Sequence, residues 1–172
     1  MHLYYKLIIS KFYLHYLNQS NFQHYLEKKF HVIGISKNSK SNINNNSYIC
    51  DLSNANKTKT LFKKLKKKFK KIDFIISCAG VSKKTYKINE NINDWHFAFD
   101  NNFYCFTNLI DEYLDIYKKN PTKIIAISSI ASNKITQAPI TYSVAKSALN
   151  FYAQIKAKEL VKNDIKINIL LP

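Results

Sequence analysis

Glycine is the residue that this sequence lacks most clearly. It occurs twice in 172 residues, as Gly34 and Gly80. Glycine-rich loops let the main chain turn tightly and approach a pyrophosphate at a helix N-terminus, where a side chain would obstruct it. Any nucleotide site in this chain must work without such a loop. Lys, Asn, Ile and Tyr are abundant instead, which is typical of biased coding composition.

Cysteine is also scarce, and long apolar runs are missing. The three cysteines are Cys50, Cys78 and Cys105; they form no C-x-x-C pair and are odd in number, which favours reduced thiols in a cytoplasmic protein. The apolar start of the chain is interrupted by Lys6 and Lys11 and has no small-residue cleavage site after it. We therefore expect neither a signal peptide nor a membrane partner.

Acidic residues are few, with 11 Asp and Glu against 27 Lys and Arg, a formal charge of +16. Such a charge raises nucleic acid or another acidic partner as a possibility. The lysines are spread along the whole chain, however, and the densest run, 63–71, carries Leu65 and Phe69 four residues apart after Leu61. This spacing predicts one buried stripe beside a solvated lysine face. We expect no nucleic acid partner, and binding of an acidic partner rests on charge alone.

The chain is long enough, and with 46% hydrophobic residues apolar enough, to form a single domain spanning 1–172. Apolar strand-like runs alternate with helical patterns, which favours a parallel sheet covered on both faces. We predict a Rossmann-like doubly wound α/β fold with strand order 3-2-1-4-5-6. The expected strands lie within 7–16 and at 31–36, 48–50, 72–77, 123–128 and 165–171, and the expected helices at 22–29, 54–70, 93–117 and 141–162.

Several polar or small residues fall where the predicted strands end. Ser36, Asp51, Cys78, Gly80 and Ser129 lie at or just beyond those ends. Ligands of doubly wound sheets bind outside the carboxyl ends of the strands. The pattern therefore predicts that these residues surround one crevice.

Tyr142 and Lys146 form the most informative pair in the sequence. Residues four apart share one face of a helix, so the lysine ammonium can lie against the phenol and favour its phenolate. A tyrosine in that setting can donate and accept protons near neutral pH. The alternative is an ordinary amphipathic helix, because Tyr and Lys are both frequent here.

The surroundings of this pair carry a family resemblance. Ser129 lies thirteen residues before Tyr142, at the end of the apolar run 124–129, and a further apolar run at 165–172 follows the helix. This order of motifs resembles the short-chain dehydrogenase/reductase family over residues 22–172. The resemblance implies an NAD(P)-dependent oxidoreductase that reduces a carbonyl or oxidises an alcohol.

The resemblance also assigns catalytic roles. Tyr142 would exchange a proton with the substrate oxygen, and Ser129 would hydrogen-bond that oxygen. Lys146 would lower the tyrosine pKa and bind the nicotinamide ribose. Asn102, seven residues after Trp95, matches the family's active-site asparagine, which holds a water in a proton relay. The resemblance implies no metal.

Cofactor contacts follow from the same resemblance. Asp51 matches the acidic residue that contacts the adenine ring, with Leu52 beside it; the alternative for Asp51 is an acid that complements a helix dipole. Lys37 stands where a base would pair with a 2′-phosphate, so NADP is slightly favoured over NAD. The alternative for Lys37 is a surface lysine.

The run 77–80, Ser-Cys-Ala-Gly, stands where the family usually has Asn-Asn-Ala-Gly. Contacts to the cofactor are implied for Cys78, Ala79 and Gly80, because the glycine lets the main chain pass close to the nicotinamide ribose.

Two features depart from the family pattern. Its phosphate loop, T-G-x-x-x-G-x-G, has no counterpart: with a short first helix the loop falls at 16–23, where Asn21 partly replaces a glycine because Asn tolerates positive φ, and with a longer helix it falls at 10–17. Pro172 matches a proline that relatives extend beyond, so we expect a fragment of a longer reading frame or a decaying copy, with the sixth strand exposed as a sheet edge. Weak cofactor binding follows from the missing glycines.

Three functions remain open at this stage. The chain resembles 3-oxoacyl-carrier-protein reductases that act on small-molecule or acyl-carrier substrates, and its run 137–149 is also similar to members placed in surface-polysaccharide synthesis. The alternatives are a catalytically inactive relative and, resting on charge alone and less favoured, a binding protein for an acidic partner. The resemblance implies a homo-oligomer through the helices at 93–117 and 141–162.

Overall fold

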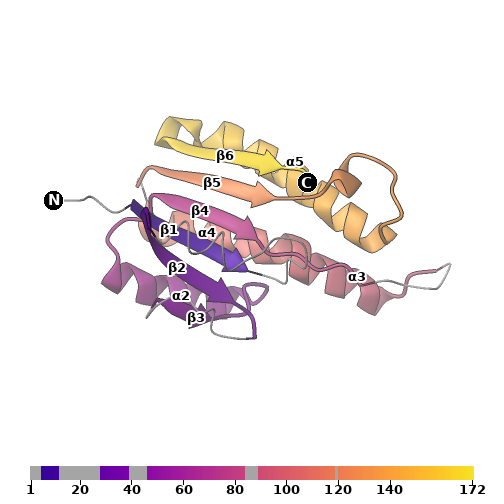
Figure 1. Ribbon diagram of the computed structural model, residues 1–172, viewed down its shortest axis with the longest axis horizontal. Coiled ribbons are helices and arrows are strands. Elements are labelled where there is room, and N and C mark those ends of the chain that lie inside the picture. The colour runs from indigo at the N-terminus through magenta and orange to yellow at the C-terminus, as the bar shows by residue number, and fades with distance from the viewer. Residues whose placement is uncertain (1–4, 12–27, 39–45, 84–88, 119) are drawn as a thin grey trace.

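The strands form one parallel sheet, in the order that the sequence predicts. The computed structural model describes residues 5–11, 28–38, 46–83, 89–118 and 120–172. In these residues six strands are arranged as β3-β2-β1-β4-β5-β6 (Figure 1). Every pairing is parallel, and β6 lies at one edge as expected. The strands are β1 (Tyr5–Lys11), β2 (Phe30–Ser36), β3 (Ser47–Ile49), β4 (Phe74–Cys78), β5 (Thr122–Ile127) and β6 (Ile165–Leu170).

The strand order reverses at β1, which pairs with β2 on one side and β4 on the other. Leu7 lies opposite Val32 in β2 and opposite Phe74 in β4. The chain thus runs outward from β1 to one edge and then returns to build the other half, as in a doubly wound sheet. The carboxyl ends of all the strands meet at one edge of the sheet, and ligands of doubly wound sheets bind outside that edge, near the reversal.

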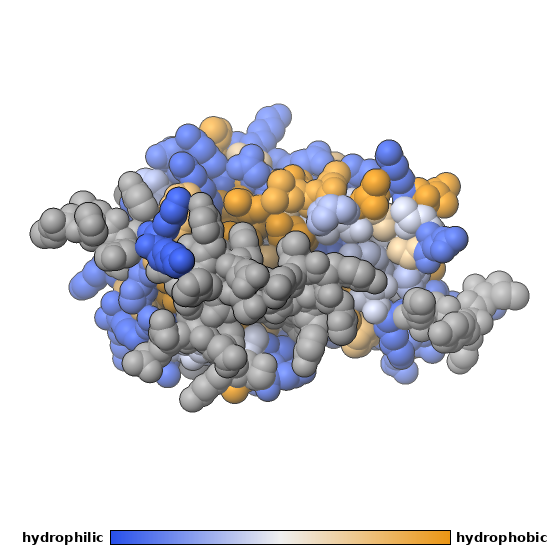
Figure 2. All heavy atoms as spheres, in the orientation of Figure 1, coloured by the Kyte–Doolittle hydropathy of each residue, from blue (hydrophilic) through white to orange (hydrophobic). Residues whose placement is uncertain are grey.

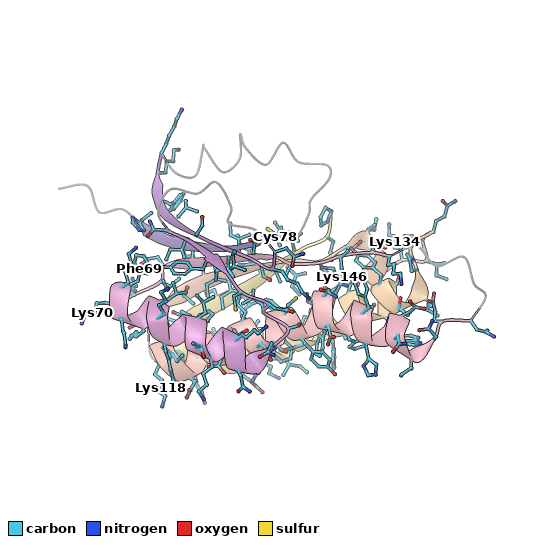
Figure 3. The ribbon with its side chains drawn as sticks, turned by 90° about the horizontal axis from the view of Figure 1, so that it is seen from below. Phe69, Lys70, Cys78, Lys118, Lys134 and Lys146 are labelled. Carbon is cyan, nitrogen blue, oxygen red and sulfur yellow. The ribbon has the colours of Figure 1, made fainter. Side chains whose placement is uncertain are left out.

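The described helices α2 (Ala55–Lys68), α3 (Ile92–Phe99) and α4 (Cys105–Tyr117) lie on the same side of the sheet, as Figure 3 shows. Helix α5 (Ile140–Leu160) packs against β6 and against the 3-10 turn at Ile130–Ser132. On the face of the sheet opposite these helices, hydrophobic side chains gather over β5 and β6 (Figure 2). No helix of the described residues is both long and apolar enough to cross a bilayer.

Helix α2 confirms the predicted buried stripe with a lysine face. The Asn54 side chain caps it by accepting a hydrogen bond from Lys57 N at 3.0 Å, which satisfies one of the unpaired donors of the first turn. Leu61, Leu65 and Phe69 are all buried. Lysines in the last turn of α2 interact favourably with the negative end of the helix dipole. Their placement therefore has a structural reason.

The predicted helix at 93–117 is present but contains a π turn that the sequence did not reveal. Residues Asp100–Tyr104 form this turn between α3 and α4. It buries Asn101 and Asn102 within an otherwise continuous helix. Such turns insert one extra residue and occur often at functional sites, and here the turn directs an asparagine toward the carboxyl edge of the sheet.

The sequence located the first strand only in part. It was expected somewhere within 7–16, whereas β1 spans Tyr5–Lys11, overlaps that window at 7–11 and is fixed by pairing of Lys11 with Ser36 and Cys78. An end at Lys11 favours the phosphate-loop register 10–17 over the register 16–23. Asn21 and most of the predicted helix 22–29 lie outside the described residues.

Candidate active site

Lys146 lies at the carboxyl edge of the sheet, beside the ends of β4 and β5. It comes from α5, its side chain is 2% exposed, and its Nζ donates to the main-chain oxygens of Ile127 at 3.0 Å and Ala79 at 3.3 Å. These carbonyls belong to the ends of β5 and β4. Burial lowers the pKa of Lys146 to about 8, because desolvation disfavours the charged form. The ammonium therefore joins three elements of the fold at one point (Figure 3).

Tyr142 lies one helical turn before Lys146. The Lys146 Nζ is 5.9 Å from the centroid of the Tyr142 ring, within reach of a cation–π interaction. The ring is half-buried. The structure thus brings together the tyrosine and the lysine whose spacing predicted a shared helix face.

Asn102 is fully buried in the π turn and holds the loop that follows β4. Its Nδ2 donates to the main-chain oxygens of Val81 and Ala98, each at 2.9 Å. Its Oδ1 accepts a hydrogen bond from Val81 N at 3.1 Å. The amide therefore pairs with Val81 much as a neighbouring strand would. Both amide hydrogens are engaged, so the expected contact with a water would fall to Oδ1 or to the main chain.

Gly80 lies against the side chains of Lys146 and Asn102. A Cβ built on Gly80 would lie 2.7 Å from Lys146 Nζ and 2.9 Å from Asn102 Oδ1. The preceding Ala79 is buried and Cys78 is half-buried at the end of β4. Residues 79–80 thus lie against the Lys146 side chain at the carboxyl edge of the sheet.

Ser129 begins the short 3-10 turn after β5. Its Oγ accepts a hydrogen bond from Ala131 N at 3.2 Å, and its carbonyl accepts one from Ser132 Oγ at 2.5 Å. Its hydroxyl hydrogen is therefore available to donate, while its position is fixed by the turn. The neighbouring Ser128 is buried instead, and its Oγ donates to the Lys146 main-chain oxygen at 3.5 Å.

Lys37 and Asp51, predicted as separate cofactor contacts, form an ion pair with 2.9 Å between Nζ and Oδ2. Burial raises the pKa of Asp51, but hydrogen bonds from Ser53 and Lys37 outweigh it and hold that pKa below its ordinary value. Lys37 Nζ also donates to Asn101 Oδ1 at 3.4 Å. The sequence carried a signal for this pair, because Lys37 and Asp51 follow adjacent strands of the predicted sheet.

Leu52, expected beside the adenine ring, is 4% exposed and belongs to the hydrophobic core. Its main-chain oxygen accepts hydrogen bonds from Thr58 Oγ1 and Asn108 Nδ2. Its side chain therefore serves packing between the end of β3 and the helices α2 and α4.

Comparison with known proteins identifies a matching family model and related sequences. A family model described as enoyl-(acyl carrier protein) reductase matches residues 25–172. A 3-oxoacyl-(acyl-carrier-protein) reductase of Synechocystis sp. is 27% identical over 126 residues, covering 71% of this chain and 50% of that protein. The chain thus spans about half the length of this curated relative.

Solved structures share the fold at low sequence identity. A short-chain dehydrogenase/reductase family oxidoreductase from Brucella ovis, in complex with a partially ordered NAD, has a TM-score of 0.83 at 16% identity, covering 98% of this chain and 83% of that one. The Pseudomonas aeruginosa RhlG/NADP complex has a TM-score of 0.82 at 19% identity, covering 99% and 73%. The predicted fold is confirmed.

Proposed function

The chain belongs to the short-chain dehydrogenase/reductase family, and we propose that it is an NAD(P)-dependent oxidoreductase that reduces a carbonyl or oxidises an alcohol. The observation that carries the proposal is the buried Lys146 ammonium beside the Tyr142 ring. A buried cation is costly unless it has partners, and here it is held by two carbonyls next to a phenol. This arrangement suits a tyrosine that moves protons.

The residues at the carboxyl edge fit a nicotinamide nucleotide. Gly80 lets the Lys146 ammonium lie against the main chain that follows β4, so Lys146 and the main chain at 79–80 would hold the nicotinamide ribose. Lys37 and Asp51 would lie at the adenosine end. The bound nicotinamide would supply or accept a hydride. The NAD and NADP complexes of structural neighbours support this assignment.

The side chains of this protein would manage the proton and the charge. In reduction, the Tyr142 hydroxyl gives its proton to the substrate oxygen, and the positive charge of Lys146 stabilises the phenolate left behind. The Ser129 hydroxyl donates to the same oxygen and stabilises negative charge as it develops. In oxidation the Tyr142 phenolate takes the proton back.

The experiment that tests this function is a titration with NADPH followed by nicotinamide fluorescence, together with turnover on a ketone. We expect Tyr142→Phe to abolish turnover and to leave NADPH binding nearly unchanged. Tyr152→Phe is the matched control, because the Tyr152 hydroxyl bonds to Asp111 at 3.0 Å, and it should retain turnover. No turnover by the parent protein would instead favour the catalytically inactive alternative.

Binding should be weak even in the parent protein, because no glycine lies between the end of β1 at Lys11 and Gly34. Each charge-assisted hydrogen bond to a pyrophosphate contributes about 1.5–3 kcal/mol. Loss of two would weaken affinity by about two to four orders of magnitude. Low-micromolar NADPH binding would show that side chains or other main-chain donors replace the glycine loop.

The substrate class of the proposal is a 3-oxoacyl group on a carrier or a small molecule. The Synechocystis relative, a 3-oxoacyl-(acyl-carrier-protein) reductase by name, supports it, and the description of the family model, an enoyl-(acyl carrier protein) reductase, shares only the acyl carrier. Comparison of a 3-oxoacyl thioester with a simple cyclic ketone of similar size tests it. Faster turnover of the thioester is the expected result.

A slight preference for NADP is the finer part of the cofactor proposal. Lys37 can attract a 2′-phosphate, although its ammonium is also bound to Asp51. Lys37→Met should weaken NADPH binding more than NADH binding. Asp51→Asn should instead favour NADPH over NADH, because the Lys37 ammonium then no longer pairs with the Asp51 carboxylate and can pair with the 2′-phosphate. Equal changes for the two cofactors would exclude Lys37 from phosphate recognition.

Association as a homodimer is also part of the proposal. Helix α5 exposes an apolar stripe at helical spacing: Ile140 is 58% exposed, Val144 39%, Phe151 67% and Ile155 43%. A second copy could cover this stripe by a two-fold contact. In analytical ultracentrifugation Phe151→Asp should shift the protein to monomer, whereas Asn56→Asp on α2 should not. A monomeric parent at high concentration would reject the contact.

A further inference from the structure

Gly80 is required by space and not by main-chain conformation. Neither described glycine has positive φ, so an L-residue could adopt the backbone of Gly80. The obstacle is a Cβ, which would lie 2.7 Å from Lys146 Nζ and 2.9 Å from Asn102 Oδ1. Real Cβ atoms essentially never make contacts under 3.0 Å, and this one would make two.

The two neighbours differ in how easily they can move. Asn102 is 0% exposed, and three hydrogen bonds hold its amide to the main chain of Val81 and Ala98. Lys146 presents the far end of a flexible side chain, Nζ at 2.7 Å and Cε at 3.2 Å from the added atom. A methyl group at position 80 would therefore displace the lysine first.

Displacement of the lysine would change the site without unfolding it. Its Nζ would leave the carbonyls of Ala79 and Ile127, the two bonds that fix it 5.9 Å from the Tyr142 ring. We propose that Gly80 is a positioning residue that keeps the Lys146 ammonium at the ends of β4 and β5, beside Tyr142. Its effect on turnover rests on the proposed function, whereas its contact with Lys146 does not.

A double-mutant cycle on the protein without cofactor tests the contact. Gly80→Ala should destabilise the parent against urea, and most of that loss should disappear in a Lys146→Ala background, because the clash with Lys146 Nζ and Cε is then absent and only the contact with Asn102 Oδ1 is left. Lys134→Ala, at an exposed lysine, is the matched control and should leave the loss intact. An equal loss in both backgrounds would overturn the proposal.

The pH dependence of turnover separates positioning from a merely structural role. The titratable groups that act on Lys146 are Tyr142 from α5, Cys78 from β4 and Cys105 from α4; burial raises the pKa of Cys105 to about 12, so it stays neutral. With the ammonium displaced, the Tyr142 phenolate loses its stabilising charge. Once displaced from its buried position, Lys146 should regain a pKa closer to its ordinary value of 10.5, so Gly80→Ala should move upward the alkaline midpoint at which turnover is lost as this lysine deprotonates.

Phe62→Leu provides the stability control for that measurement. Phe62 is buried in α2, so its truncation lowers stability without touching Lys146, and the midpoint should not move. An unmoved midpoint in an active Gly80→Ala protein would overturn the positioning role even if the cycle shows coupling. If the parent protein has no turnover, the proposed function fails, and the urea cycle alone decides whether Gly80 fixes Lys146.

Discussion

Two lysines at the same edge of the sheet are held in opposite ways. Lys146 is 2% exposed and bonds to neutral main-chain carbonyls, whereas the Lys37 side chain is 30% exposed and pairs with the carboxylate of Asp51. Desolvation dominates at Lys146 and lowers its pKa to about 8. Lys37 keeps a charged partner in a setting that solvent still screens.

This difference indicates which end of the proposed cofactor site, that of Lys146 or that of Lys37 and Asp51, tolerates substitution. A buried ammonium without a carboxylate depends on the position of every neighbour, so small shifts have large effects. A partly exposed ion pair contributes little to stability and can exchange partners with a ligand. We therefore expect the nicotinamide end of the proposed cofactor site to be rigid and sensitive, and the adenosine end to be tolerant.

The largest expected effect is on turnover through Lys146. Lys146→Met keeps the length of the side chain and removes its charge, so Tyr142 loses the cation that favours its phenolate. Turnover should fall by about 10²- to 10⁴-fold, the usual contribution of acid–base catalysis. Lys134→Met, at an exposed position, should leave turnover unchanged. A loss below tenfold would place the proton transfer elsewhere.

Asn102 should give the next largest effect, on stability. Asn102→Ala removes the partners of the Val81 N–H and of the Val81 and Ala98 carbonyls. Buried polar groups left without partners each destabilise by about 1–3 kcal/mol, so urea unfolding should show a loss of about 4 kcal/mol in total. Asn56→Ala, at an exposed position on α2, should change stability by less than about 0.5 kcal/mol.

The pH dependence of stability should reveal Lys146 without any ligand. Its pKa falls from 10.5 to about 8 on folding, so between these values the unfolded chain binds more protons than the folded one. Stability attributable to this lysine must then rise with pH from about 8 to about 10.5, by roughly 3 kcal/mol. The difference between the parent and Lys146→Met in urea unfolding at pH 8 and pH 10 measures it. A difference that does not change with pH would mean that Lys146 is solvated.

Much of the fold could be predicted because its strands are continuous apolar runs. The run 123–128 predicted β5 at Thr122–Ile127, and the lysine-rich run 63–71 predicted the buried stripe of α2 correctly. The window for β1 ran past the end of the strand at Lys11 because no glycine occurs in the sequence there to mark that end. Local pattern fails where apolar residues continue past the end of a strand.

The details of the site required tertiary structure. The π turn at Asp100–Tyr104 is not visible in the 3.6-residue periodicity of apolar residues along the helix. The burial of Asn102 could therefore be inferred only from the family resemblance. The pairing of Lys37 with Asp51 could have been inferred from the predicted order of β2 and β3. The contact of Gly80 with Lys146 could not, because it depends on α5 crossing the ends of two strands. Residue types were predictable, whereas most of their partners were not.

The smallest expected effect is on the Lys37–Asp51 pair, and it sharpens the contrast between the two lysines. Hydrogen bonds from Ser53 and Lys37 hold the pKa of Asp51 below its ordinary value against the opposing effect of burial. The stability that the ionised Asp51 contributes is therefore present above the ordinary carboxyl pKa. It is lost as pH falls through the lowered pKa of Asp51 in the folded protein. Lys37→Met should destabilise by less than about 1 kcal/mol.

Salt distinguishes the two lysines most directly. Raising the ionic strength to about 1 M shortens the screening length to about 3 Å, which weakens a partly exposed ion pair but scarcely reaches a buried ammonium held by carbonyls. The effect of Lys37→Met on urea unfolding should shrink in salt, whereas the effect of Lys146→Met at pH 7 should persist. Equal salt sensitivity of the two variants would mean that burial does not separate the two ends of the proposed cofactor site.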